Sequence, residues 1–223
     1  MGIKENLNKI KEQIDNIKVK IIAVTKYATQ QQISETYELG IRDFGESYVQ
    51  DAIKKLSLEY NGESFSNLAK WHFIGRLQKN KVKYIVPRFH LIHSVDSLEL
   101  LEVIDRVAQK NNHIQNVLMQ VNVSQEESKA GFKPDELKNT FDRLSSLSNI
   151  NILGLMTMAP NTKDNSVIKN CFHELNNIRK EINKTYNVSL KELSMGMSND
   201  YKIAVECGAT MIRLGRILFK ENL

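Results

Sequence analysis

Short apolar segments alternate with amphipathic segments along the whole chain. The apolar segments are typical of buried strands, because parallel sheets covered on both faces are built from short runs rich in Val, Ile and Leu. Helical periodicity lies between them and is clearest over residues 97–110 and 135–147. The predicted strands cover residues 20–24, 42–45, 71–75, 90–95, 116–123, 151–158, 192–197 and 211–217.

A strand–helix unit that repeats eight times predicts parallel pairing with right-handed crossovers. Eight such units in 223 residues fit a (β/α)8 barrel, a TIM barrel at the small end of its size range. The segment "MGIKENLNKIKEQI" adds a helix before the first strand. An open doubly wound sheet is the alternative, but no early GxGxxG fingerprint supports it. We therefore expect residues 1–223 to form one barrel domain.

Lys26 follows the first predicted strand, at a place where an ammonium group is unusual. Because alternate residues of a barrel strand face the lumen, Lys26 shares an inward face with Ile22 and Val24. It would therefore lie at the C-terminal mouth, where barrel enzymes carry their active sites. A lysine that extends into bulk water is the alternative interpretation.

The last predicted strand brings a second cation to the same mouth. In "MIRLGR", Arg213 shares an inward parity with Met211 and Gly215. A guanidinium in a barrel needs an anion or another acceptor. The loops after the last two strands usually bind phosphate in this fold. Here these loops are "GMSND", which carries the Ser198 hydroxyl, and "GRI", which begins at Gly215.

A lysine, an arginine and a phosphate cradle at one mouth predict pyridoxal 5′-phosphate held as a Schiff base on Lys26. We expect the Lys26 amine to be desolvated beside another cation, which would lower its pKa and make it nucleophilic. A lysine-dependent aldolase that acts on a phosphorylated sugar is the alternative chemistry for the same amine.

Seven segments of the chain resemble a known family. They are "IIAVTK", "DFGESYVQDAIKK", "WHFIGRLQKNK", "HSVDS", "VNVSQEESKAGF", "LGLMTMAP" and "LSMGMSNDYKIAVECGATMIRLGRILF". The family is that of the pyridoxal-phosphate homeostasis proteins, single-domain relatives of the alanine racemase N-terminal barrel. The resemblance extends over about residues 20–219.

The resemblance implies a role for each matching residue. Lys26 corresponds to the Schiff-base lysine of the family, and Arg213 to the arginine near the ring nitrogen of the cofactor. Ser198 corresponds to a phosphate-binding serine. Gly215 and Arg216 correspond to the phosphate-binding turn after the last strand.

Four positions depart from the family pattern. Ala28 and Thr29 stand where the family often has a second lysine and a proline, so no second lysine is expected there. Ser47 stands where the family usually has asparagine, and it is included among the cofactor-binding residues on that correspondence. Lys220 stands in place of a glycine.

The resemblance also implies a non-catalytic role in the homeostasis or carriage of pyridoxal phosphate, with apoenzymes that require the cofactor as partners. A pyridoxal-phosphate-dependent amino-acid racemase with weak activity is the alternative. Racemisation needs a proton acceptor on each face of the bound amino acid, and 223 residues leave no room for the second domain that supplies one. An arginine beside the pyridine nitrogen also leaves that nitrogen unprotonated. We therefore expect a carrier and not an enzyme.

Composition and charge narrow the partners further. The net charge of +5 is mild and spread along the chain, so we expect no nucleic-acid partner. No apolar run approaches the length of a membrane span and the N-terminus does not resemble a signal peptide, so we expect a cytoplasmic protein. Cys171 and Cys207 lack CxxC or histidine spacing, which predicts buried thiols and no metal site. A monomer is the family expectation.

Overall fold

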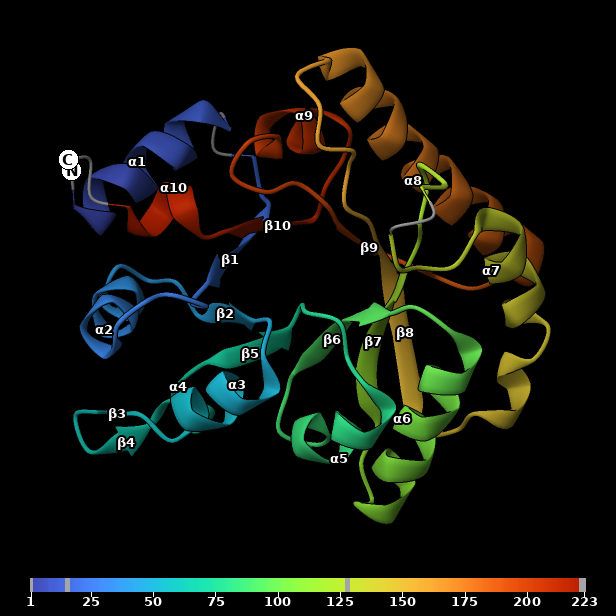
Figure 1. Ribbon diagram of the computed structural model, residues 1–223, viewed down its shortest axis with the longest axis horizontal. Helices are drawn as coiled ribbons and strands as arrows, with labels where there is room; N and C mark the ends of the chain where they lie inside the picture. Colours follow the sequence, from blue (N-terminus) through green and yellow to red (C-terminus); the bar gives the residue numbers. More distant parts are fainter. Residues whose placement is uncertain (1, 15–16, 127–128, 221–223) are drawn as a thin grey trace.

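A closed barrel of eight parallel strands forms the centre of the computed structural model, which describes residues 2–14, 17–126 and 129–220 (Figure 1). The barrel confirms the predicted fold, and β1 closes it by pairing with both β10 and β2. Its strands are β1 (Lys20–Val24), β2 (Asp43–Glu46), β5 (Lys70–Phe73), β6 (Leu91–Val95), β7 (Gln115–Gln120), β8 (Ile150–Met156), β9 (Glu192–Ser194) and β10 (Met211–Leu214).

Helices follow the strands on the outside of the barrel. They are α2 (Gln30–Glu38), α3 (Val49–Leu56), α4 (Phe65–Leu68), α5 (Val82–Ile85), α6 (Leu98–Lys110), α7 (Pro134–Phe141), α8 (Asn165–Tyr186), α9 (Tyr201–Glu206) and α10 (Arg216–Phe219). The predicted extra helix is α1 (Ile3–Gln13), which lies beside α10 (Figure 1). The Asn6 side chain holds the two together by donating a hydrogen bond to the Leu218 carbonyl over 3.1 Å.

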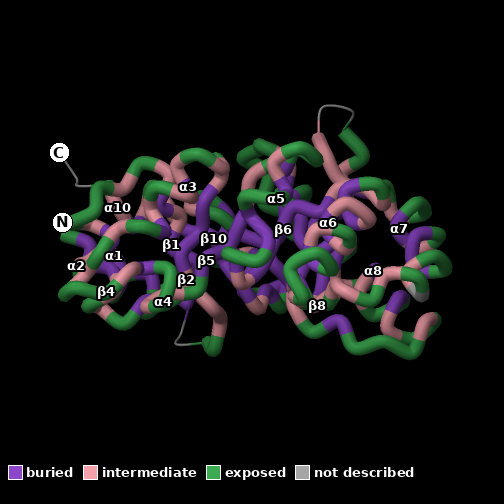
Figure 2. The backbone as a smooth tube through the Cα atoms, turned by 90° about the horizontal axis from the view of Figure 1, so that it is seen from below, coloured by how far each residue is buried: buried purple, intermediate pink, exposed green. Residues whose placement is uncertain are grey.

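The alternation of side chains separates two apolar layers, as the strand pattern predicts. Ile22 and Met211 belong to a lumen cluster with Leu91, Leu118 and Met156. The intervening residues of β1 and β10 belong instead to the layer between the barrel and its helices. In Figure 2 the barrel strands are the buried centre of the molecule. The inward parity predicted for Ile22 and Met211 is therefore confirmed.

Several strands end earlier than predicted, such as β9 at Ser194 and β10 at Leu214, and two further local features differ from the sequence-based prediction. The helix expected over 135–147 ends at Phe141, and a short 3-10 turn follows at Leu144–Ser146. Residues 139–142, "NTFD", include no strong helix former, so the helix has little to extend it. A hairpin of β3 (Glu59–Tyr60) and β4 (Glu63–Ser64) was not predicted, although its Asn-Gly turn is a strong hairpin signal.

The two cysteines lie in the helical layer, Cys171 on α8 and Cys207 directly after α9. Cys171 and Cys207 are both free and buried, which confirms the predicted buried thiols. Burial raises the pKa of each thiol, so both remain protonated at neutral pH. Among the described residues no cluster of three or more His, Cys, Asp and Glu side chains could hold a metal ion. In the same part of the chain, no helix combines the length and apolar character that crossing a membrane requires.

Candidate functional site

Lys26 lies two residues beyond β1, at the C-terminal mouth of the barrel. Its Nζ is 4.7 Å from the centroid of the Tyr27 ring and 5.4 Å from that of the Tyr48 ring. Hydrogen bonding to Tyr27 raises the pKa of Lys26 above its ordinary value and outweighs the opposing effect of burial. The expectation of a desolvated amine with a pKa lowered by a second cation is therefore wrong, because the contacts of Lys26 with Tyr27 and Tyr48 outweigh its partial burial.

Arg213 faces the lumen from β10, on the strand next to Lys26. Its side chain is 4% exposed, and the NH1 group donates to Ser194 Oγ over 2.6 Å while NH2 donates to the Thr157 carbonyl over 3.0 Å. Burial lowers the pKa of Arg213 to about 10, against the attraction of the Asp200 carboxylate, so the guanidinium stays charged at neutral pH. The predicted inward cation is present, and both of these acceptors are neutral oxygens.

The two loops predicted to bind phosphate lie against each other. The Ile217 backbone N–H donates to Ser198 Oγ over 3.4 Å, which joins the loop after β9 to the turn after β10. Ser198 and Arg216 line one pocket of about 680 Å³, together with the exposed cations Lys9 and Lys202 and with Asp200. These three cations outnumber the one carboxylate, which itself accepts from the Met197 N–H, so the pocket suits an anion. Neither Lys26 nor Arg213 lines this pocket.

Gly215 lies where the turn after β10 passes close to β1. A Cβ at this position would lie 3.3 Å from Val24 Cβ and 3.4 Å from the Val24 carbonyl oxygen. The absence of a side chain at Gly215 therefore allows the turn to pack closely against β1.

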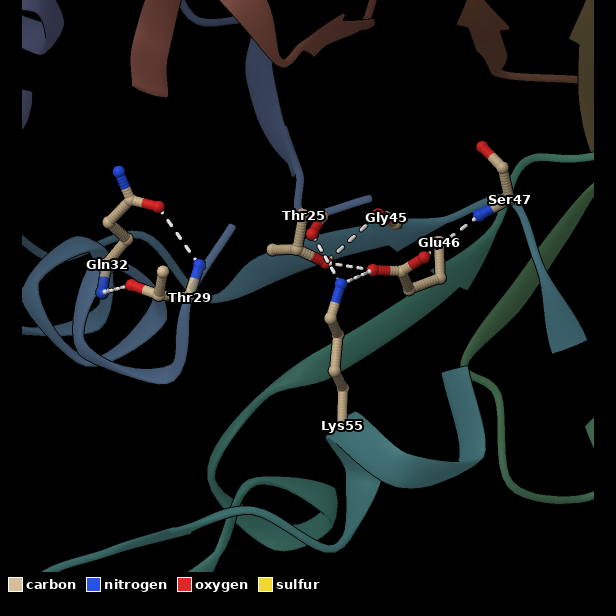
Figure 3. A network of polar contacts seen from close by, with 7 residues as sticks. All are labelled: Thr25, Thr29, Gln32, Gly45, Glu46, Ser47 and Lys55. Atoms are coloured by element: carbon tan, nitrogen blue, oxygen red, sulfur yellow. Dashed lines mark hydrogen bonds and ion pairs between the residues drawn. The ribbon is translucent and has the colours of Figure 1, made fainter. Parts of the chain in front are cut away.

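Ser47 belongs to a polar cluster between the barrel and α3 (Figure 3). Its backbone N–H donates to Glu46 Oε2 over 3.2 Å, while Glu46 Oε1 accepts from Thr25 Oγ1 over 2.6 Å. Lys55, in the last turn of α3, donates to both Glu46 Oε1 and the Thr25 carbonyl over 2.5 Å. Because Thr25 immediately precedes Lys26, this cluster fixes the backbone from which the Lys26 side chain extends.

Glu46 and Lys55 were not predicted as site residues. The available signal was a carboxylate directly after an apolar run, followed nine residues later by a lysine at the end of an amphipathic segment. Glu46 is fully buried, and a buried carboxylate needs a partner of opposite charge. The sequence therefore predicts a cationic partner for Glu46 but does not identify which lysine it is.

The fold and the mouth together define a class of protein, a (β/α)8 barrel with a lysine after its first strand and a buried arginine on its last. The family model described as "Alanine racemase, N-terminal domain" matches residues 2–222. A pyridoxal phosphate homeostasis protein of Aquifex aeolicus is 42% identical over 91% of this chain and 87% of its own length. One of Synechocystis is 42% identical over 92% of each.

Solved structures of similar proteins are also related to this chain. PipY of Synechococcus elongatus with PLP bound has a TM-score of 0.86 at 35% identity, over 98% of this chain and all of that one. An alanine racemase of Clostridium difficile has a TM-score of 0.75 at 18% identity and is covered over 57% of its length, a likeness of fold. The chain therefore belongs to the alanine racemase N-terminal domain family and, within it, to the pyridoxal phosphate homeostasis proteins.

Proposed function

We propose that this protein binds pyridoxal 5′-phosphate through a Schiff base on Lys26 and holds it without catalysing amino-acid chemistry. The observation that carries the proposal is the close relationship to PipY, whose structure contains PLP, over nearly the whole of this chain. The names of the curated relatives support a role in pyridoxal phosphate homeostasis. The same proposal includes delivery of the cofactor to apoenzymes that require it. It also includes a monomeric state, a single domain over residues 1–223 and a cytoplasmic location.

The residues present at the mouth fit this cofactor. Lys26 offers an amine to its aldehyde, and Ser198 with the Gly215–Arg216 turn offers hydrogen-bond donors and a positive charge to its phosphate. Arg213 offers guanidinium N–H groups to the ring nitrogen. In enzymes the bound cofactor acts as an electron sink, and a guanidinium beside the ring nitrogen limits that role because it keeps its proton.

An amino-acid racemase is the second candidate, because the fold is shared with alanine racemase. Such a reaction needs a second proton acceptor opposite Lys26. Tyr201 is a poor candidate, since it is buried, its hydroxyl contacts Gln13 Oε1, and burial raises its pKa. Tyr48 is exposed at the rim and lies against Lys26 itself. These observations favour the carrier.

Borohydride reduction of the protein after incubation with pyridoxal phosphate tests the proposal. The absorbance of the bound cofactor should disappear on reduction, and peptide mapping should find the label on Lys26. A label on another lysine with Lys26 unmodified would contradict the assignment. Formation of D-alanine from L-alanine at a rate typical of enzymes, roughly 1 s⁻¹ or more, would contradict the carrier role.

A further inference from the structure

A chain of polar side chains crosses the lumen of the barrel from Arg213 to Asp43. Arg213 donates to Ser194 Oγ over 2.6 Å, and Ser194 Oγ is 2.8 Å from His93 Nδ1. His93 Nε2 is 2.9 Å from His72 Nδ1, and His72 Nε2 is 2.9 Å from Asp43 Oδ1. Ser194 and both histidines are fully buried. The chain connects the arginine to a carboxylate at the first residue of β2, near the opposite end of the barrel.

The Asp43 carboxylate fixes the direction of the hydrogen bonds when both imidazoles are neutral. A carboxylate only accepts, so His72 carries its hydrogen on Nε2 and accepts at Nδ1 from His93 Nε2. His93 Nδ1 then accepts the hydroxyl hydrogen of Ser194. Ser194 Oγ in turn accepts from Arg213, because a guanidinium can only donate. Each link has one donor and one acceptor, with both imidazoles neutral.

The surroundings favour these protonation states. Burial lowers the pKa of His72 and lowers that of His93 well below its ordinary value, so both are neutral at pH 7. Burial also lowers the pKa of the neighbouring His90 to about 4.

Asp43 keeps its negative charge. Burial alone would raise the pKa of Asp43, but the hydrogen bond from His72 and the positive charges of Lys20 and Lys70 lower it below its ordinary value. The chain therefore ends on a carboxylate at one side and on a guanidinium at the other.

We propose that Ser194, His93, His72 and Asp43 are positioning residues for Arg213, which aim its guanidinium at the ring nitrogen of the bound cofactor. The inference rests on the proposed function, in which Arg213 contacts that nitrogen. The ion pairs formed by the described residues include none with Arg213. Ser194, His93, His72 and Asp43, which we call the relay, supply a fixed acceptor for the Arg213 guanidinium instead. Successive hydrogen bonds polarise one another toward the carboxylate at the end of the relay.

This arrangement makes the relay a determinant of specificity. An arginine held as a donor selects a ring with an acceptor at the facing position and rejects one with a C–H group there. A site built to form a hydrogen bond discriminates strongly against a ligand that lacks the partner, because its polar group is then left unpaired. If the relay loosens, Arg213 can turn away and this discrimination falls.

The test compares two ligands, pyridoxal phosphate and its carbocyclic analogue with C–H in place of the ring nitrogen. The wild-type protein should bind pyridoxal phosphate about tenfold or more tightly than the analogue. Ser194→Ala breaks the relay next to Arg213 and should reduce this preference at least threefold. Asp43→Asn retains an acceptor for His72 but removes the charge, so it should reduce the preference about twofold. Asp135→Asn, on the exposed side of α7, is the matched control and should leave it unchanged.

The ratio of the two affinities is the measured quantity because a general loss of stability changes both ligands alike. Thermal unfolding of each ligand-free variant identifies any that fail to fold, and Asp43→Asn, at the far end of the relay, then carries the test. An unchanged ratio in folded variants of the relay would overturn the inference. Equal binding of both ligands by the wild type would also overturn it, while leaving the proposed function intact. Binding of neither ligand would overturn both.

Discussion

Replacement of Lys55 by methionine tests the polar cluster beneath the mouth. Methionine keeps much of the length of the side chain but removes the ammonium group that donates to Glu46 Oε1 and to the Thr25 carbonyl. Glu46 is fully buried, and only 13% of the Lys55 side chain is exposed. After the change, Glu46 keeps the Thr25 hydroxyl and the Ser47 N–H as donors, but its charge has no ion-pair partner in the cluster.

The expected loss of stability follows from that geometry. Removal of one partner of a buried ion pair costs about 3–5 kcal/mol. Because Glu46 retains two hydrogen-bond donors, we expect the lower end of this range, about 3 kcal/mol. For a protein of this size, that loss corresponds to a fall in Tm of roughly 6–12 °C. Adding Glu46→Gln removes the unpaired charge, so the double variant should recover about 1–2 kcal/mol.

Urea unfolding followed by the fluorescence of Trp71, the single tryptophan, measures these free energies. Trp71 is 1% exposed and packs at 5.6 Å against Phe44 of β2, so its emission reports on this side of the barrel. Lys54→Met, one residue earlier and exposed, is the control and should change stability by less than about 0.5 kcal/mol. A loss below about 1 kcal/mol in Lys55→Met, or a double variant less stable than the single one, would refute the reasoning.

Three further predictions concern the ligand and pH. Ser198→Ala should weaken binding of pyridoxal phosphate about tenfold and barely affect pyridoxal, measured by titration calorimetry; equal losses would remove Ser198 from the phosphate site. The rate at which Lys26 forms the Schiff base with pyridoxal phosphate, followed by absorbance, should rise about tenfold per pH unit between pH 7 and 9, because only the neutral amine reacts and the pKa of Lys26 is raised. A rate that does not change with pH would contradict this. The free energy of unfolding should fall between pH 7 and 5, by up to about 2 kcal/mol each for His72 and His93, because these histidines bind protons in the unfolded state and stay neutral in the folded state. Denaturant titrations at several pH values measure this fall, and a constant stability would show that the two histidines are not buried in the neutral form.

The barrel was predictable because its signals are local. Each strand is a short apolar run with its own flanking helix, and the parity of Ile22 and Met211 places both in the lumen as predicted. The Asn61–Gly62 hairpin could have been predicted on the same grounds, since both residues adopt positive φ angles of 51° and 82° as its turn requires.

The polar partners were not predictable in the same way. His72 and His93 lie on neighbouring strands, but Ser194 contacts His93 across a sequence separation of 101 residues. Such a contact depends on how the closed barrel stacks its lumen residues in layers. The raised pKa of Lys26 likewise depends on the side chains of Tyr27 and Tyr48 and not on the strand pattern. Sequence parity indicates that a polar side chain faces inward, while its hydrogen-bond partner follows only from the folded register.

The protonation states around the mouth bear on the choice between carrier and racemase. General acid–base catalysis works best when the pKa of the catalytic group lies near the working pH. Here no such match exists: burial lowers the pKa of Arg213 only to about 10, so it stays charged, and the raised pKa of Lys26 keeps its amine protonated. Burial lowers the pKa of His93 and raises that of Tyr201, so both remain neutral. Groups in these states can bind and orient a phosphorylated pyridine, and none of them has the pKa near 7 that a general acid or base needs, which agrees with the carrier that we propose.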